Sequence, residues 1–291
     1  MFLRWATILF LSACAQAPQP AAPEWARFTH PEPVVIQGYD GDAMEPFLAR
    51  DGSTLFFNNS NAPDAQTDLH WAERVNDTTF VYRGRIDGAN SPALDGVASL
   101  SAAGRLCFIS TRSYEATLST VYCSTWREGA ADAPSLQREA SVHIRGRLMF
   151  DLEQSASGSE LVVADGEFRG GPAPATADLR LARWRDGRFA LSAADDTMFS
   201  ALNTPALEYA AALSADGLTL AFTRLGGHMP FIRTNIWIAR RSAINAAFDA
   251  PVRIDAIDGD WVEGPTFSSD DRAIYYHRKV GDHYSIWRVS R

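Results

Sequence analysis

Residues Ser214–Phe222 read SADGLTLAF, an Asp-Gly turn between two apolar segments. Four other stretches have nearly the same form: FLARDGSTLFF (47–57), SLSAAGRLCF (99–108), LEQSASGSELVV (152–163) and TFSSDDRAIY (266–275). The turn positions, which are separated by 52, 54, 59 and 54 residues, are Gly52, Gly104, Gly158, Gly217 and Asp271. A period just above fifty residues with a hairpin at its centre indicates a propeller or a solenoid.

A second pattern follows each hairpin. It begins with a small polar residue and then alternates apolar and polar residues, as a half-buried strand does. The five copies are DLHWAER (68–74), TVYCSTW (120–126), DLRLARW (178–184), NIWIARR (235–241) and SIWRVSR (285–291). Candidate fourth strands are Thr79–Tyr82, Phe189–Ser192 and Pro251–Asp255. Four antiparallel strands per repeat predict an all-β propeller.

The best-formed repeat places Leu202-Asn203-Thr204 and Glu208 ahead of Leu213-Ser214-Ala215-Asp216-Gly217, and two others begin with Glu45-Pro46-Phe47 and Glu263-Gly264-Pro265. These residues resemble the repeats of TolB-type, WD-like β-propeller proteins of the cell envelope. The resemblance covers about residues 45–291, with a degenerate third repeat around Gly158. It implies a β-propeller and leaves the function open, because one fold supports many kinds of site.

Five motifs predict a five-bladed propeller. Six blades are the alternative, which requires a hidden repeat that no interval is long enough to hold. The last repeat ends at Arg291, directly after its third strand. We expect Pro33–Gln37 (PVVIQ) to supply the fourth strand of this repeat and to join the two ends of the ring.

The chain begins with a short basic and apolar segment typical of a secretory signal. Residues Leu11-Ser12-Ala13-Cys14 resemble the lipobox of bacterial lipoproteins, which implies cleavage before Cys14 and lipidation of its thiol. Because Ala15 rather than Asp follows, the resemblance implies the outer membrane. We therefore predict a lipoprotein signal peptide (1–13), a Pro/Ala tether (14–24) and a periplasm-facing β-propeller (25–291). The alternative is an ordinary signal peptide with an incidental cysteine.

Composition narrows the classes of partner. The net charge of −8 argues against binding to nucleic acid and against a basic patch for a lipid surface.

Of the three cysteines, Cys107 and Cys123 remain after lipidation, on strands expected to be antiparallel neighbours. A disulfide between them suits an oxidising envelope. Two buried free thiols are the alternative.

The loops that enter the inner strands and those that follow the second strands open on one face of a propeller. We therefore expect a binding site at the channel mouth on this face. The candidate residues are Glu45, Asn59, Arg112, Tyr114, Glu208, Arg224, Trp261, Glu263, His277 and Arg278. Among these, Trp261 and Tyr114 are suited to stack on a ligand or to anchor a partner.

The repeated glutamates Glu45, Glu208 and Glu263 have two interpretations. Two carboxyl groups about 5 to 9.5 Å apart can hydrolyse a glycosidic bond. However, these residues belong to the repeat pattern itself, and capping of the blade entrance by hydrogen bonds explains them better. No catalytic residue is therefore assigned.

No metal or other cofactor is expected. His277, His283 and Asp282 could bind a metal, but solvated loop residues are the favoured interpretation. The acidic set of Asp40, Asp42, Asp258 and Asp260 could hold calcium, which needs several oxygen ligands. The Asp258-Gly259-Asp260 segment is shorter than a known calcium loop.

These features favour a lipid-anchored, non-catalytic scaffold that binds an envelope protein or peptide and contacts the membrane through its anchor. The alternatives are a glycan-active enzyme, either a glycoside hydrolase or a lyase, and a glycan-binding module. A carboxyl group of raised pKa beside a second acid in a pocket would favour the enzyme. A broad face with an apolar centre would favour the protein partner, and an aromatic platform around Trp261 would favour a sugar.

Overall fold

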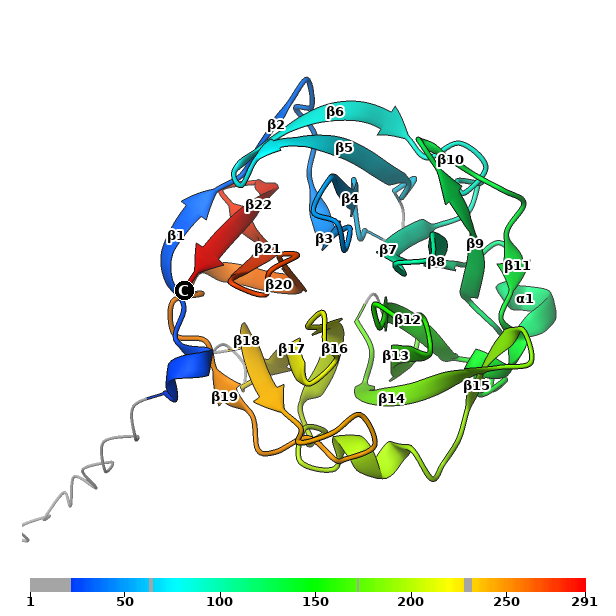
Figure 1. Cartoon of the computed structure of the whole chain (residues 1–291). Coiled ribbons are helices and arrows are strands. Elements are labelled where there is room, and N and C mark those ends of the chain that lie inside the picture. The colour runs from blue at the N-terminus through cyan, green and yellow to red at the C-terminus, as the bar shows by residue number, and fades with distance from the viewer. Residues whose placement is uncertain (1–21, 63–64, 172, 228–231) are drawn as a thin grey trace, which may run out of the picture.

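The computed structural model describes residues 22–62, 65–171, 173–227 and 232–291, which form an all-β propeller (Figure 1). This confirms the predicted fold class. The predicted signal peptide, the lipidated Cys14 and most of the tether lie outside the described residues and stay predictions. Within the described ranges, no helix is both long and apolar enough to cross a membrane.

The strands of the described residues divide into five antiparallel units, numbered here in chain order. The inner strands are β3 (Met44–Leu48), β7 (Asp95–Leu100), β12 (Arg147–Gln154), β16 (Leu207–Leu213) and β20 (Asp260–Phe267). The second strands are β4 (Thr54–Asn58), β8 (Arg105–Ser110), β13 (Glu160–Glu167), β17 (Thr219–Gly226) and β21 (Ala273–Val280). The third strands are β5 (Leu69–Asn76), β9 (Val121–Arg127), β14 (Thr176–Arg185), β18 (Arg233–Arg240) and β22 (His283–Ser290). Each unit therefore contains one copy of both sequence patterns.

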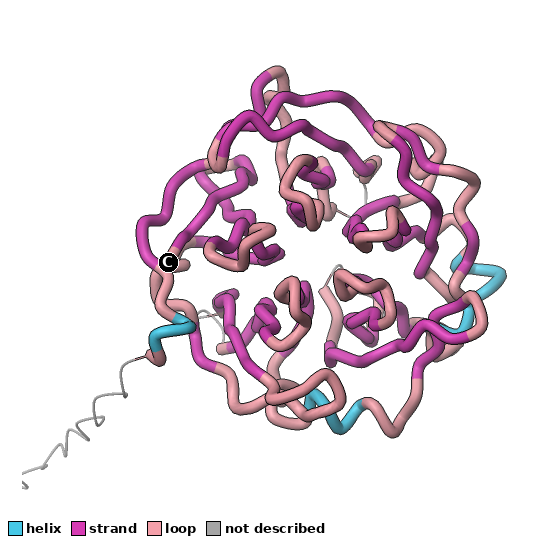
Figure 2. The backbone as a smooth tube through the Cα atoms, viewed as in Figure 1, coloured by secondary structure: helices cyan, strands magenta, loops and turns pink. Residues whose placement is uncertain are grey.

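The outer edges of the units are less regular. Their strands are β6 (Thr79–Arg85), β10 (Ala130–Ala131), β11 (Ser135–Leu136), β15 (Arg188–Leu191), β19 (Val252–Arg253) and β1 (Thr29–Pro33). Short helical turns lie in the loops outside the strands (Figure 2): η1 (Glu24–Ala26), α1 (Tyr114–Thr117), η2 (Arg138–Ala140) and η3 (Asp196–Phe199). The innermost strands thus lie around the centre of the ring, and the outer strands lie at its rim (Figure 1).

An N-terminal strand closes the ring, but it is not the predicted one. Strand β1 pairs antiparallel with β22, and Pro33 lies opposite Trp287. The predicted closing segment, Pro33–Gln37, contributes mainly to β2 (Val35–Gln37), which pairs in parallel with β6 of the first unit. Val34 and Ile36 are buried between the first and fifth units, so their apolar character reflects this packing.

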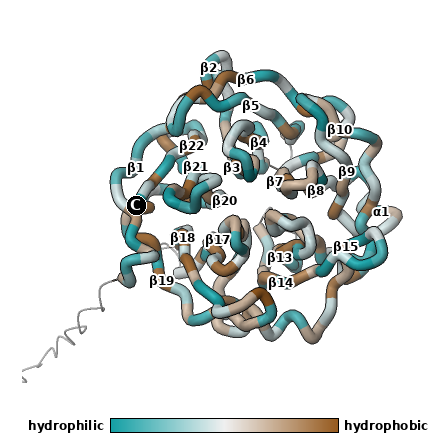
Figure 3. The backbone as a smooth tube through the Cα atoms, viewed as in Figure 1, coloured by the Kyte–Doolittle hydropathy of each residue, from teal (hydrophilic) through white to brown (hydrophobic). Residues whose placement is uncertain are grey.

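The hydrophobic core is divided among the junctions between units, and apolar residues recur around the whole ring (Figure 3). Each of its five clusters combines side chains from two neighbouring units. In the cluster between the second and third units, Cys107 and Cys123 lie opposite each other on β8 and β9 and form a disulfide. Because each unit is buried by its neighbours, closure of the ring stabilises every blade.

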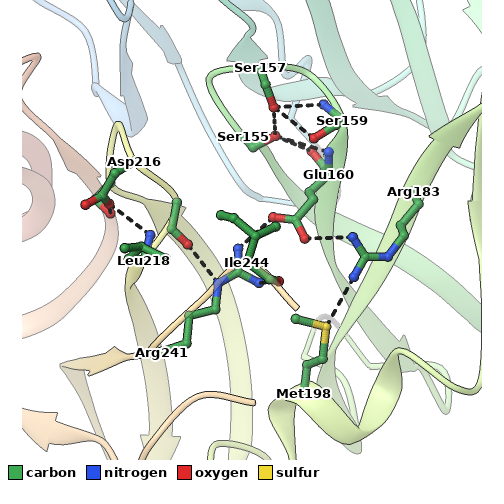
Figure 4. Close-up of polar contacts among 12 residues, drawn as sticks. Ser155, Ser157, Ser159, Glu160, Arg183, Met198, Asp216, Leu218, Arg241 and Ile244 are labelled. Carbon is green, nitrogen blue, oxygen red and sulfur yellow. Dashed lines mark hydrogen bonds and ion pairs between the residues drawn. The ribbon is translucent and has the colours of Figure 1, made fainter. Parts of the chain in front are cut away.

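A buried ion pair joins the third and fourth units (Figure 4). Glu160 on β13 accepts from Arg241, which follows β18, at 2.6 Å, and both side chains are 2% exposed. Arg183 on β14 contacts the other carboxylate oxygen of Glu160 at 3.0 Å. Arg241 also donates to the carbonyl oxygens of Gly217 and Ile244, each at 2.8 Å. Every charge at this junction therefore has a partner, as burial requires.

Candidate active site in the channel

The inner strands present one equivalent residue each to the channel. These residues lie four positions before Ala49, Ser101, Ser155, Ser214 and Ser268, and together they line its narrow part: Glu45, Val97, Asp151, Ala210 and Gly264. Every inner strand has a register irregularity close to this position. Such a bulge re-aims a side chain, and bulges are frequent beside active sites.

The backbone at four of these positions has a positive φ: 46° at Glu45, 56° at Val97, 49° at Ala210 and 61° at Gly264. This conformation is uncommon for residues other than glycine and is costly for a β-branched residue such as Val97. Its repetition shows that the inner strands are bent in the same way in several units. At two of the five positions, Glu45 and Asp151, the side chain that lines the channel is acidic.

A cavity of about 660 Å³ lies on the face where the loops enter the inner strands. The acids Asp42, Glu45, Asp151 and Glu263 are in its wall. Apolar and aromatic side chains cover much of the remainder, and they include Met44, Val97, Leu148, Phe150, Phe168, Tyr209, Trp261 and Tyr284. The predicted face therefore has a cavity that combines carboxyl groups with aromatic side chains, as small-molecule sites do.

Arg50 spans the channel beyond this cavity. Its guanidinium contacts Glu153 of the third unit at 2.5 Å and the carbonyl oxygen of Leu213 of the fourth unit at 2.9 Å. It also donates to the carbonyl oxygen of Gln154 at 2.7 Å. These bonds link three units across the centre, so we infer that a ligand enters the cavity from the loop face.

One hydrogen bond holds Glu263 in place, because the hydroxyl of Tyr209 donates to Oε1 at 2.8 Å. Nε2 of His277 lies 3.6 Å from Oε2, which is beyond hydrogen-bond distance but close enough for an electrostatic contact. Nδ1 of His277 accepts the backbone N–H of Glu45 at 3.1 Å, so the proton of the neutral ring is on Nε2 and faces Glu263. Glu45 in turn accepts from the side-chain amide of Asn61 at 2.7 Å. The first, fourth and fifth units therefore cooperate in positioning these carboxyl groups.

Burial changes the pKa values of the acids in the cavity and of His277. It raises the pKa of Asp151 well above the ordinary value, and the neighbouring Glu45, Glu153 and Glu263 raise it further. Burial also raises the pKa of Glu45, although His277 opposes this effect. Burial alone would lower the pKa of His277, but Glu45 and Glu263 raise it above the ordinary value. The cavity therefore holds a carboxyl group that favours its protonated form beside others that accept hydrogen bonds.

The spacing of Glu45, Glu263 and His277 also resembles that of metal ligands, because each offers one atom within 4.8 Å of the others. A histidine that binds a metal normally donates its second ring N–H to an acceptor. Here Nδ1 accepts the amide of Glu45 instead, so Nε2 has no free electron pair for a metal. These residues fit a hydrogen-bonded acid cluster better than a metal centre. Among the described residues, no other group of acids and histidines, the Asp40 to Asp260 set included, is spaced to share an ion.

The structure brings together four of the predicted site residues. Glu45, Trp261 and Glu263 line the cavity, and His277 lies directly behind two of them. The interpretation of His277 as a solvated loop residue is wrong, because its side chain is 0% exposed on β21. Trp261 is 46% exposed at the rim, where a ligand can reach its ring.

The other six predicted residues lie outside the described wall of the cavity and have structural contacts. Glu208 binds the backbone and hydroxyl of Thr204 and pairs with Arg224, which agrees with the capping interpretation. Asn59 and Arg112 bind neighbouring loop residues, the former the amide of Asp68 and the latter the buried Asp95. Tyr114 on α1 accepts the amide of Gly146. Arg278 lies over the ring of Trp287.

Two residues of the site were missed by sequence reasoning. Asp151 lies in the degenerate third repeat, and Tyr209 does not belong to a repeated acidic position. A signal for Asp151 was present, because it stands four residues before Ser155, as Glu45 stands four before Ala49. Aligning the inner strands by this position, rather than by the Glu residues, would have found it.

Asp151 has a predictable effect on stability. An acid whose pKa is raised by folding retains a proton that the unfolded chain releases, so its stability contribution falls as pH rises from the unfolded pKa, about 4, through the folded pKa. We expect Asp151→Asn to unfold at higher urea than the wild type at pH 7.5, with a smaller difference at pH 5. Urea midpoints at both values measure this. Glu115→Gln removes the same charge from an exposed ion pair and serves as the control. Equal pH dependence in all three proteins would contradict the expectation.

Gly264 makes room for the acid cluster. A Cβ atom there would lie 2.6 Å from Oε2 of Glu45 and 3.0 Å from Nδ1 of His277. Gly281 has a similar φ of +63°, but its Cβ would meet nothing within 4 Å. Alanine at either position adds backbone strain of about 1–2 kcal/mol. We expect the free energy of unfolding to fall by at least about 1 kcal/mol more in Gly264→Ala than in Gly281→Ala, because overpacking adds a cost of that order. Urea denaturation measures both, and equal losses would show that the contact with Glu45 is relaxed cheaply.

No protein-family profile matches the chain, and no curated protein is similar to it in sequence. Solved structures share its fold. The catalytic domain of a GH62 alpha-L-arabinofuranosidase from Coprinopsis cinerea has a TM-score of 0.55 at 10% identity, over 91% of this chain and 96% of that one. An alpha-L-arabinofuranosidase from Podospora anserina has a TM-score of 0.53 at 10% identity, over 91% and 95% of the two chains. A hypothetical protein from Leishmania major has a TM-score of 0.52 at 14% identity, over 91% and 90%. Similarity at these identities shows the β-propeller fold alone, and the TolB-type assignment stays a prediction.

Proposed function

We propose that this protein is a glycan-active hydrolase that cleaves a glycosidic bond in the channel cavity. The observation that supports this is the position of Asp151, a buried carboxyl group of raised pKa, in one cavity with Glu45 and Glu263. Strand β12, which carries Asp151, lies across the channel from β3 and β20, which carry the two glutamates (Figure 1). Two carboxyl groups of different protonation on opposite sides of a sugar are what glycoside hydrolysis requires.

The roles follow from the hydrogen bonds. Asp151 in its protonated form donates its proton to the glycosidic oxygen as the bond from that oxygen to the anomeric carbon breaks. Glu263, which already accepts from Tyr209, takes the proton of the water that adds to that carbon. Glu45 helps to keep Asp151 protonated, because its charge raises the pKa of Asp151. Donor and acceptor thus supply general acid–base catalysis.

The cavity wall supports a sugar ligand. Trp261, Tyr284, Phe150 and Phe168 line the cavity around the acids. Aromatic side chains cover the apolar faces of sugars, while the carboxyl groups bind hydroxyls. The structural neighbours include two arabinofuranosidases, so this fold accommodates glycoside hydrolysis in other proteins, which is compatible with the proposal.

Two further proposals stand beside this one. The first is a scaffold that binds an envelope protein or peptide, and the acidic cavity favours the hydrolase over it. Lipid anchoring through Cys14 and a periplasm-facing position at the outer membrane would give the enzyme access to envelope or imported glycans.

The test is a screen of the full chain against a panel of neutral, basic and acidic oligo- and polysaccharides, with release of reducing ends as the readout. We expect at least one glycan to be cleaved by the wild type and by Glu115→Gln, the surface control. Asp151→Asn should lose about 10²–10⁴-fold in rate, the usual contribution of a general acid. Absence of cleavage across the panel, or cleavage that Asp151→Asn retains, would overturn the proposal.

A further inference from the structure

The described wall of the cavity is acidic. Asp42, Glu45 and Glu263 line it beside Asp151, which favours its protonated form, and no lysine or arginine among the described residues does so. Three arginines of the blades form ion pairs with acids that do not line this cavity: Arg50 with Glu153, Arg147 with Asp165 and Arg224 with Glu208. His277 behind Glu263 and His283 beside Asp42 are the titratable bases that face these acids. The field inside the cavity therefore favours a positive ligand.

The remaining wall also suits a cation. Trp261, Tyr284, Phe150 and Phe168 line the same cavity, and aromatic ring faces attract ammonium groups. Glu45 and Glu263 each place an oxygen within 4.8 Å of the other, which is close enough for one ammonium group to bind both. A charge-assisted hydrogen bond is about twice as strong as a neutral one, so such a group would be held firmly. A carboxylate or phosphate on the ligand would instead face these acids, with no lysine or arginine in the described wall to bind it.

We propose that the sugar unit bound in this cavity carries a protonated amine, so that the substrate is a glycan that contains amino sugars, and that uronic acids and phosphorylated sugars are rejected. The identification of the ligand as a sugar rests on the proposed hydrolase function, whereas the preference for positive charge rests on the wall of the cavity. The two can therefore fail separately.

Isothermal titration of the full chain at pH 7 tests the charge preference without any turnover. The ligands are glucose, two amino sugars with the amine at carbon 2 or carbon 6, and glucuronic acid, so that the ring is constant. Ethanolamine provides the amine without a ring. We expect one amino sugar to bind at least about tenfold more tightly than glucose, the value of one strong polar contact, and glucuronic acid and ethanolamine to bind more weakly than glucose.

Two variants test whether the acids of the cavity wall cause the preference for amino sugars. Glu263→Gln should remove most of the preference for the amino sugar, and Glu115→Gln, which lowers the net negative charge equally on surface helix α1, should keep it. Equal binding of glucose and amino sugars, tighter binding of glucuronic acid, or no binding at all would overturn the inference. Ethanolamine binding as tightly as the amino sugars would overturn the assignment to a sugar. Amino-sugar binding without cleavage of any glycan would refute the hydrolase and leave the charge preference intact.

Discussion

Replacing Glu263 by glutamine is expected to reduce kcat/KM for the cleaved glycan by about 10²–10⁴-fold, the range for loss of a general base. Glutamine has nearly the same shape, so Tyr209 can still donate to the side-chain oxygen at the place it occupies now. The amide cannot accept a proton from water. We therefore expect kcat to fall while the fold and the urea midpoint remain close to those of the wild type.

Tyr209→Phe is the matched comparison for this variant. It removes the hydroxyl that donates to Glu263 but leaves the carboxylate in place. The expected loss is smaller, about tenfold, because one hydrogen bond positions the base and does not replace it. Initial rates for both variants and for Glu115→Gln decide the point. If Glu263→Gln retained more than about a tenth of the wild-type kcat/KM, Glu263 would not be the base.

The second large effect concerns stability. Arg241→Ala is expected to lower the free energy of unfolding by roughly 3–5 kcal/mol, because it leaves a buried carboxylate with one partner fewer. Figure 4 shows Arg241 between Glu160 and the backbone of the fourth unit, and Arg241 is 2% exposed. Its removal also leaves the carbonyl oxygens of Gly217 and Ile244 without this donor. The junction between the third and fourth units should weaken.

Two further variants separate charge from packing at this junction. Arg183 contacts the same Glu160 but is 20% exposed, so we expect Arg183→Ala to lose less, about 1–2 kcal/mol. The double variant Glu160→Met with Arg241→Met removes both buried charges and should recover most of the loss of Arg241→Ala, as apolar replacement of buried pairs often does. Guanidinium unfolding measures all three. A loss below about 1 kcal/mol for Arg241→Ala would show that water enters the junction.

The fold could be predicted from the sequence because each repeat contains local features that are typical of a propeller blade. Each copy contains an Asp-Gly-type turn followed by an alternating strand, and every copy folds as these features predict. The closing strand was harder to predict. The segment THPEP (29–33) is largely exposed and gives no apolar signal, yet it pairs with β22, whereas Val34 and Ile36 are buried between units. Hydrophobicity predicts that a segment is buried, but it does not predict which strand the segment pairs with.

The site was only partly predictable for a related reason. Glu45, Glu263 and Glu208 stand four, five and six residues before the end of their inner-strand motif at Ala49, Ser268 and Ser214. Side chains alternate between faces along a strand and a bulge shifts this alternation, so one residue of offset changes the environment completely. The first two reach the cavity, whereas Glu208 turns to Thr204 and Arg224. The pKa of Asp151 depends on acids from other units, which no local pattern contains.

The proposed hydrolysis requires a carboxyl group of raised pKa, Asp151, in one cavity with Glu45 and Glu263. A carbon-13 NMR titration of side-chain carboxyl groups, in protein labelled at Asp and Glu, measures this directly, with Asp151→Asn to assign the signal. We expect one aspartate signal that titrates well above the ordinary range of aspartate and that disappears in Asp151→Asn. If every carboxyl group titrated near pH 4, its ordinary range, the cavity would hold no acid to donate a proton, and the proposed hydrolysis would be contradicted.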